Sequence, residues 1–169
     1  SRYEKYFPLF IALLAFALYW NSLFNKFSFD DKLVTYIHPQ VQKGIKGIPE
    51  IFSTNYATAY GESFEYRPLT KASFAFEYEI FGENPFISHL VNVLLYCLTC
   101  FCLYRITLSL FASCGRLFAF TAVLFFLVHP AHTEAVASLK NREEVLSFLF
   151  CLLSVEFFII SQALENWHF

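Results

Sequence analysis

The sequence predicts an all-α, polytopic transmembrane helix bundle of about four spans, with a long extracytoplasmic loop that contains short amphipathic helices. Of the residues, 57% are apolar and only 15% are charged, and the mean hydropathy is +0.47. Soluble domains are richer in charge than this. The 23 Phe and 10 Tyr residues suit a chain that faces acyl chains and lipid headgroups. The net charge of −2 argues against a nucleic-acid-binding protein, which would need a strongly basic face.

Four apolar segments are expected to cross the membrane, at about 6–23, 85–110, 116–128 and 145–164. The first is too long for the apolar region of a signal peptide, and no small-residue cleavage site follows it. Asn84 and Pro85 begin the second span as N-cap and first-turn residues. The third is short, because His129 precedes Pro130 and the residue before a proline avoids helical geometry.

Two polar segments, 24–84 and 129–144, separate these spans. Short helices are expected within the first segment at 48–52 and 70–81, the latter with an apolar stripe of Phe74, Tyr78 and Phe81. Because two spans lie between the polar segments, both must be on the same face of the membrane. Lys and Arg residues on the short opposite segments favour an extracytoplasmic position for that face.

Asp30 and Asp31 follow the first span closely. Two adjacent carboxylates are costly to hold together unless a positive charge lies nearby. One of them could be a general base that accepts a proton from an attacking hydroxyl, while the other orients it. An Asp-Asp pair is also common in helix caps and turns, so the pattern alone leaves both interpretations open.

Three further polar residues could contact a substrate. Arg67 follows an aromatic stretch, and arginine is the side chain best shaped for two-point contact with a phosphate. It could instead pair on the surface with Glu62 or Glu65. His89 and Asn92 lie one turn apart on the second span and share a face. They could reach a lipid phosphate or simply form hydrogen bonds between helices.

The polar segment after the third span is the richest in chemical groups. His129, His132 and Glu134 invite a metal, but their spacing is not the helical His-x-x-x-His of zinc hydrolases. We therefore expect no metal cofactor, beyond a loosely held divalent cation beside a phosphate. A polar pocket is the better interpretation, in which Lys140 or Arg142 neutralises a phosphate and His132 or Glu134 positions a sugar.

Two other features lie within the apolar segments. Glu156 is a carboxylate inside the fourth span and is a functional candidate by its depth, although it could also reach water near the inner end. Cys97 and Cys100 have the spacing of half a metal or redox site, but no second pair exists. We expect these cysteines to be packing residues.

Several short motifs occur in a characteristic order along the chain. They are Phe29-Asp30-Asp31, Tyr66-Arg67-Pro68-Leu69-Thr70, Phe81-Gly82-Glu83-Asn84-Pro85, His89-Leu90-Val91-Asn92, and His129-Pro130-Ala131-His132-Thr133-Glu134-Ala135-Val136. In this order the chain resembles the N-terminal part of the transmembrane, tetratricopeptide-repeat-containing O-mannosyltransferases and their bacterial relatives. These proteins are similar in turn to the GT-C glycosyltransferases.

The resemblance implies an inverting transfer of mannose or another hexose from a polyprenyl- or dolichyl-phosphate donor to a hydroxyl acceptor on a protein or glycan. It implies an active face that is extracytoplasmic or lumenal, in a bacterial inner membrane or the endoplasmic reticulum membrane. The acidic motif of the family's first outer loop falls on Asp30 and Asp31, with Asp30 as the base. A glycosyl phosphate already carries its leaving group, so the remaining need is for cations near the departing phosphate.

The chain departs from the family in its extent. The family's members have more spans, and the repeat-carrying ones end in a helical repeat array, so we interpret 1–169 as the N-terminal part of a GT-C-like transmembrane domain. Ser at the first position and the lack of Met also indicate a piece of a longer protein. Catalysis by this piece alone is not expected. The alternatives are a non-catalytic membrane subunit or scaffold and a transporter of lipid-linked sugars, and only the enzyme requires Asp30.

Overall fold

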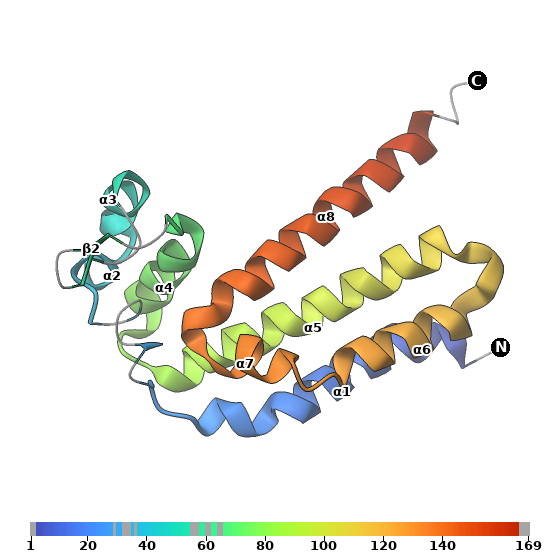
Figure 1. Ribbon diagram of the computed structural model, residues 1–169, viewed down its shortest axis with the longest axis horizontal. Helices are drawn as coiled ribbons and strands as arrows, with labels where there is room; N and C mark the ends of the chain where they lie inside the picture. Colours follow the sequence, from blue (N-terminus) through green and yellow to red (C-terminus); the bar gives the residue numbers. More distant parts are fainter. Residues whose placement is uncertain are drawn as a thin grey trace.

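The chain forms a bundle of long apolar helices with a smaller helical module at one end (Figure 1). The computed structural model describes all residues except 1–2, 29, 32–34, 36, 55–57, 60–61, 64–65 and 166–169. The α-helices are α1 (Phe7–Tyr19), α2 (Pro39–Gln42), α3 (Ile48–Ser53), α4 (Pro68–Phe81), α5 (Pro85–Leu110), α6 (Gly115–Leu127), α7 (His132–Ala137) and α8 (Arg142–Glu165). The 3-10 helices are η1 (Glu4–Tyr6), η2 (Trp20–Phe24), η4 (Gly44–Gly47), η5 (Ala112–Cys114) and η6 (Leu139–Asn141).

The predicted all-α class is confirmed. In the part of the chain that the structure describes, the exception is one small antiparallel pair, β1 (Thr58–Ala59) and β2 (Glu62–Ser63). Thr58 is opposite Ser63 and Ala59 is opposite Glu62. The expected short helices of the first polar segment are present as α3 and α4.

Three helical segments of the described chain are long and apolar enough to cross a membrane: Glu4–Phe24, Pro85–Leu110 and Leu139–Leu164. They correspond to the first, second and fourth expected spans. The third expected span is the shorter α6, whose 13 residues rise only about 20 Å. The hydrocarbon core of a bilayer is about 30 Å thick, so α6 alone is too short to cross it.

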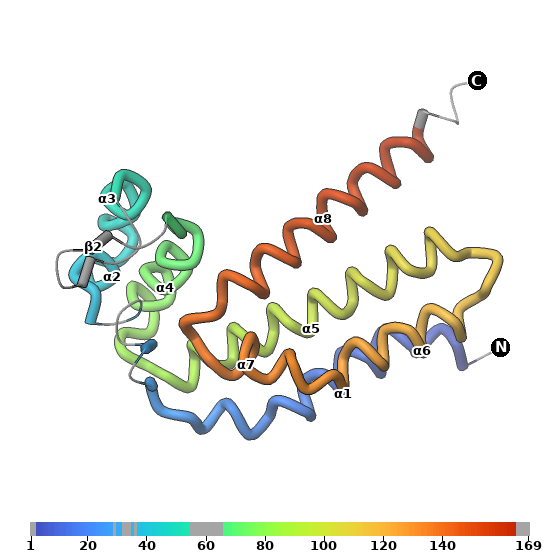
Figure 2. Tube along the Cα trace, viewed as in Figure 1, coloured from blue at the N-terminus to red at the C-terminus, as the bar shows by residue number. Residues whose placement is uncertain are grey.

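The end of α6 lies beside the middle of α5 rather than its beginning. The Tyr96 hydroxyl of α5 donates a hydrogen bond to the backbone carbonyl of Leu127 at the end of α6 (3.2 Å). The chain then continues through α7, where the Asn92 side chain of α5 donates to the carbonyl of Val136 (3.2 Å). The segment after α6 thus completes the return toward the end of the bundle where α5 begins (Figure 2).

The core of the bundle lies between α1, α5 and α6 and contains many small side chains. Ala15, Cys100 and Ala119 are completely buried there, next to Val93 and Val123. Small residues let membrane helices approach closely, and dispersion contacts rather than water exclusion hold such helices together. Cys97 and Cys100 of α5 are not in disulfides and pack as small apolar groups in this core, whereas the buried Cys102 packs against α8.

Helix α8 packs along α5, with Leu149 and Leu152 of α8 clustered with Cys102 of α5, and its C-terminal end projects away from the bundle (Figure 1). Much of its outer surface is apolar and exposed, including Phe150, Phe157 and Phe158. Farther along, Glu156 of α8 forms an ion pair of 2.7 Å with Arg105 of α5. The intramembrane carboxylate therefore has a cationic partner across the two helices.

The first polar segment folds into a module of α2, α3 and α4 at the end of the bundle. Phe74 and Tyr78 of α4 pack inward against a cluster that includes Val41, whereas Phe81 is 51% exposed. Two residues of the predicted apolar stripe therefore pack inward, and the third is exposed. Lys71 on the inward face of α4 is buried. Its ammonium group donates a hydrogen bond to the Gln40 side chain (3.0 Å), and this bond offsets part of the cost of burying the charge.

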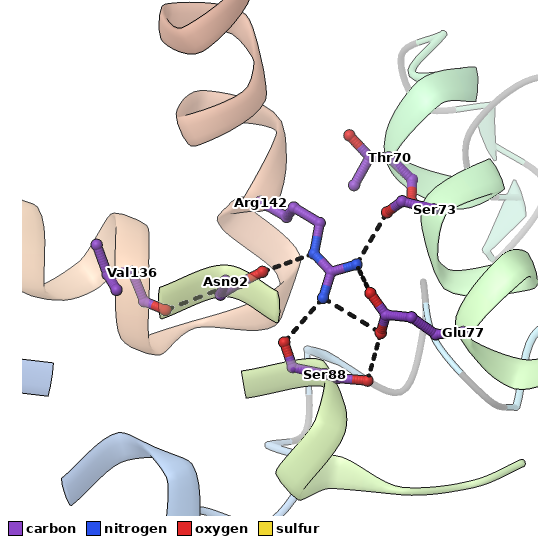
Figure 3. Close-up of polar contacts among 7 residues, drawn as sticks. All are labelled: Thr70, Ser73, Glu77, Ser88, Asn92, Val136 and Arg142. Atoms are coloured by element: carbon purple, nitrogen blue, oxygen red, sulfur yellow. Dashed lines mark hydrogen bonds and ion pairs between the residues drawn. The ribbon is translucent and has the colours of Figure 1, made fainter. Parts of the chain in front are cut away.

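One buried arginine joins three helices at the boundary between this module and the spans (Figure 3). Arg142, the first residue of α8, has no exposed surface. Its Nε donates to the Asn92 side chain of α5 (2.6 Å). One terminal nitrogen donates to Ser73 (2.9 Å) and Glu77 of α4, and the other donates to the Ser88 carbonyl (2.9 Å) and to Glu77 (3.4 Å). All five guanidinium N–H groups therefore have acceptors.

The surroundings of this guanidinium reinforce the arrangement. The Phe74 ring lies 3.8 Å from the guanidinium carbon, in cation–π geometry. The Ser88 hydroxyl donates to the second carboxylate oxygen of Glu77 (2.9 Å). A buried charge is tolerated only when it is paired and fully hydrogen bonded, and this network meets both conditions.

We expect Arg142→Met to lower the free energy of unfolding by about 3–5 kcal/mol, because it leaves the Glu77 carboxylate buried without its partner. Reversible unfolding in mixed micelles measures the change. The double variant Arg142→Met/Glu77→Leu should recover most of the loss, since it removes both charges. Lys43→Ala, in the exposed pair with Glu50, is the control and should have little effect. A single variant as stable as its parent would contradict this role.

The module should also lose stability in mild acid through His38. Burial and the nearby Lys71 ammonium lower the pKa of His38 from 6.5 to about 4. Between these two values the unfolded chain binds a proton that the folded chain does not, so stability falls as the pH drops from 6.5 to 4. Hydrogen exchange of the segment 38–54 across this pH range measures the effect.

His38→Gln should flatten this acid-dependent loss of protection, while His129→Gln, outside the module, should leave it unchanged. An unaltered pH profile in His38→Gln would show that other groups cause the loss.

Candidate active site

The two polar segments meet at one end of the bundle, where α1 ends and where α5 and α8 begin (Figure 1). One direct link is a hydrogen bond of 2.9 Å from the backbone N–H of Lys140, in η6, to the Asp31 carboxylate. The acidic pair and the histidine-rich segment therefore share one end of the molecule, as the alternation of the spans requires.

Asp31 acts as a clamp for the backbone. Its side chain is almost completely buried, and each carboxylate oxygen accepts one backbone N–H, from Ser28 (2.8 Å) and from Lys140 (2.9 Å). Its own carbonyl accepts a hydrogen bond from the Thr35 hydroxyl (2.6 Å). The carboxylate thus holds the loop after α1 against η6, and both of its oxygens are already occupied.

Asp30 differs from its neighbour in being exposed. Its carboxylate lies 3.5 Å from the ammonium nitrogen of Lys140, and the two side chains are 57% and 42% exposed, respectively. Lys140 therefore contacts both aspartates, one through its backbone and one through its side chain. This lysine provides the positive charge that two adjacent carboxylates need. Phe29, which belongs to the same motif, lies outside the described residues.

A polar cavity of about 680 Å³ opens beside this cluster. Its size falls within the range of small-molecule binding sites. A second cavity of about 420 Å³ adjoins it and shares Asn25, Pro130, Thr133 and Ala137 with it. The larger cavity is lined by Asn25, Lys26, Ser28, Asp31, His89, Pro130, Ala131, Thr133, Glu134, Ala137 and Ser138.

His89 and Asn92, predicted to share a face of the second span, have different surroundings. Asn92 is completely buried between helices, where it accepts from Arg142 and donates to Val136. His89 is 1% exposed and lines the larger cavity. Neither of its ring nitrogens forms a hydrogen bond with the described residues. The backbone of Lys26 lies near the ring without such a bond.

The other two candidate histidines, His129 and His132, do not line the larger cavity. His132 packs on Phe126, with ring centroids 4.2 Å apart, and near Tyr96 at 5.8 Å. Burial lowers the pKa of His132 below its ordinary value. His129 is exposed, and its Nδ1 accepts the Ala131 N–H (3.2 Å). Among the described residues, no group of three or more His, Cys, Asp or Glu side chains could hold a metal ion.

The remaining predicted residues have protein partners. Arg67 forms an ion pair with Glu143 of α8. The side chains of its expected partners, Glu62 and Glu65, lie outside the described residues. Glu134 accepts a long hydrogen bond from Asn141 (3.4 Å) and lines the larger cavity. Arg142, predicted to contact a phosphate, has all of its N–H groups bonded to the protein, as described above.

Sequence reasoning missed several residues of this region. Glu77, the buried partner of Arg142, is one of two acids, with Glu79, on the otherwise apolar and aromatic second half of α4, and the sequence does not show which of the two is buried. Lys26, Ser28 and Ser138 carried no signal, because small polar residues in loops are common and only the fold brings them to one cavity.

Three known proteins with similar sequences are much longer than this chain. Protein O-mannosyl-transferase TMTC1 of Mus musculus is 38% identical over 85% of the chain and 16% of its own length. TMTC2 of the same organism is 35% identical over 84% of the chain and 17% of its length, and TMTC3 is 30% identical over 96% and 18%.

The chain spans less than a fifth of the length of these curated relatives. No family model matches the chain, and no solved structure matches it. The similarity nevertheless extends over most of the chain in three separately named relatives. Over most of its length, this chain is therefore similar to protein O-mannosyl-transferases of the TMTC type.

Proposed function

We propose that the protein containing this chain is a glycosyltransferase that moves a hexose from a polyprenyl- or dolichyl-phosphate donor to a hydroxyl group of a protein. The observation that carries the proposal is the exposed Asp30 carboxylate, held beside the Lys140 ammonium at the end of the spans, next to a polar cavity. The relatives are named protein O-mannosyl-transferases, which favours mannose as the sugar and a protein as the acceptor.

In this proposal Asp30 is the general base. Its carboxylate accepts the proton of the acceptor hydroxyl while that oxygen attacks the anomeric carbon of the sugar. The bond from the anomeric carbon to the phosphate oxygen breaks, and the lipid phosphate leaves with the bonding electrons. The attack comes from the side opposite to the phosphate, so the configuration inverts. The greater exposure of Asp30 supports this assignment over Asp31, whose oxygens both accept backbone N–H groups.

Lys140 is the best-placed cation for the departing phosphate. The Lys140 side chain is 42% exposed, and its ammonium group lies beside the carboxylate of the proposed base. Arg142 is instead a positioning residue, because it fixes the first turn of α8 two residues after Lys140. Arg67 is a second candidate for phosphate contact, since its side chain is 32% exposed beside Glu143.

The proposed reaction takes place on the extracytoplasmic or lumenal face of the membrane, to which we assign both polar segments. We propose that no tightly bound metal takes part, because the leaving group is already a phosphate and a lysine is available to stabilise its charge. The donor reaches this face through its lipid chain, and the acceptor reaches it from water.

Asp30→Asn should reduce kcat by about 10²–10⁴-fold, because the amide cannot accept the proton of the acceptor hydroxyl. Donor binding should remain measurable. Radiolabel transfer by the complete protein in nanodiscs tests the prediction, with Glu83→Gln as an exposed carboxylate control. Turnover retained in Asp30→Asn would remove Asp30 as the base.

Lys140→Ala should weaken donor binding by about 10–100-fold, because a charge-assisted contact with the phosphate is lost. Acceptor binding should change far less, and the backbone bond to Asp31 is preserved. Equilibrium binding of donor and of acceptor peptide separates the two effects, and the exposed Lys46→Ala is the matched control. Chelators should leave turnover unchanged. Unaltered donor affinity in Lys140→Ala, or a strict requirement for a divalent ion, would contradict the assignment.

A further inference from the structure

We infer that the larger cavity is the subsite for the transferred sugar, and that His89 is the residue that recognises the sugar's hydroxyl groups. The inference rests on the proposed function, since it names the part of the donor that this cavity takes. It starts from the side chain of His89, which is 1% exposed and has no hydrogen-bond partner for either ring nitrogen among the described residues.

An unpartnered buried imidazole is unusual. Burial of a polar group without a compensating hydrogen bond costs free energy, and nearly all buried polar groups in folded proteins have a partner. The neighbouring Asn92 and Ser88 of the same helix are both fully used in the Arg142 network. His89 is the exception on this face of α5, and it lines the cavity, so a ligand there can supply the missing partners.

The lining of the cavity suits a neutral, hydroxyl-rich ligand better than a phosphate. Ser28, Thr133 and Ser138 offer hydroxyl groups that both donate and accept hydrogen bonds. Asp31 and Glu134 bring two carboxylates, which repel an anion, and Glu134 can also accept hydrogen bonds from sugar hydroxyls. The lining carries two carboxylates and one cation, Lys26, so its net charge is negative and disfavours a phosphate.

The shape of the cavity agrees with this ligand class. Pro130, Ala131 and Ala137 line it with small or rigid side chains, which leave the volume open. A neutral imidazole has one N–H donor and one acceptor nitrogen, so His89 can bond two hydroxyl groups at once. The ring is stiff and buried, so it loses little conformational freedom when the ligand binds.

The cavity also lies beside the proposed reacting groups. Asp31 lines it, and the same carboxylate holds the backbone of Lys140, whose ammonium contacts Asp30. Lys140 and Asp30 do not line the cavity themselves, so in this proposal the phosphate and the anomeric carbon extend from its Asp31 side toward them. The sugar subsite and the phosphate contact are adjacent but made by different residues, which allows them to be tested separately.

The experiment compares two lipids in the complete protein in nanodiscs, in the Asp30→Asn background so that no transfer consumes the donor. The probes are mannosyl-phosphoryl polyprenol and sugar-free polyprenyl phosphate, and equilibrium affinities are measured for both. His89→Phe should weaken binding of the sugar-bearing lipid by about tenfold or more, because two hydrogen bonds are lost. Its affinity for the sugar-free lipid should be unchanged.

Thr99→Val is the matched control, since Thr99 is also a buried polar residue of α5 and its hydroxyl bonds only within that helix, to Leu95 (2.8 Å). It should leave both affinities unchanged. His89→Asn retains a donor and an acceptor on a shorter side chain, so its affinity for the sugar-bearing lipid should lie between those of the parent and His89→Phe. It also serves as the test variant if His89→Phe does not fold.

Three results would overturn the inference: equal affinities of parent and His89 variants for the sugar-bearing lipid, an equal loss for both lipids, or a loss confined to the acceptor peptide. The second would mean that the cavity holds the phosphate, and the third that it holds the acceptor. Failure of the proposed base is a separate outcome, because it would be seen as turnover in Asp30→Asn, while the difference in lipid affinity would still decide the role of His89.

Discussion

The buried guanidinium of Arg142 is the constraint on which the arrangement of this molecule depends. It is the point where the membrane spans α5 and α8 and the extramembrane helix α4 are joined by directional bonds rather than by apolar contact. Apolar packing between helices in a bilayer allows sliding and rotation, because lipid chains are as apolar as the side chains. A planar group with five fixed donors allows neither.

This constraint reaches the candidate site over a short stretch of chain. Lys140 lies two residues before Arg142, and its backbone N–H bonds to Asp31. The position of α8 therefore sets the position of the lysine, and the lysine sets that of both aspartates. Asn92, which is also bonded to Arg142, donates a hydrogen bond to the Val136 carbonyl and so links α7 to the same network. The acidic loop, the histidine-rich segment and the start of α8 are thus held as one unit.

The sequence was sufficient for features that local chemistry determines. The N-cap at Asn84 accepts the Ile87 N–H as expected, and α5 has the expected bounds. The closeness of Asp31 to the second polar segment followed from counting spans. The sequence could not separate Asp30 from Asp31, or Lys140 from Arg142, because neighbouring residues differ in burial only through partners far away in the chain. The partner of Arg142 lies 65 residues away, in a helix whose polar face turns inward.

The short α6 has a consequence for how a lipid would meet this protein. Helix α6 ends roughly 16 Å along α5, and the polar segment that follows it lies at a depth where acyl chains would otherwise be. Non-helical backbone is tolerated at such depth only against protein or water. Around α6 this segment therefore needs a protein neighbour, a locally thinned bilayer or water. With water there, the lipid-phosphate donor proposed above would meet the protein at the level of its own headgroup and would not have to leave the membrane.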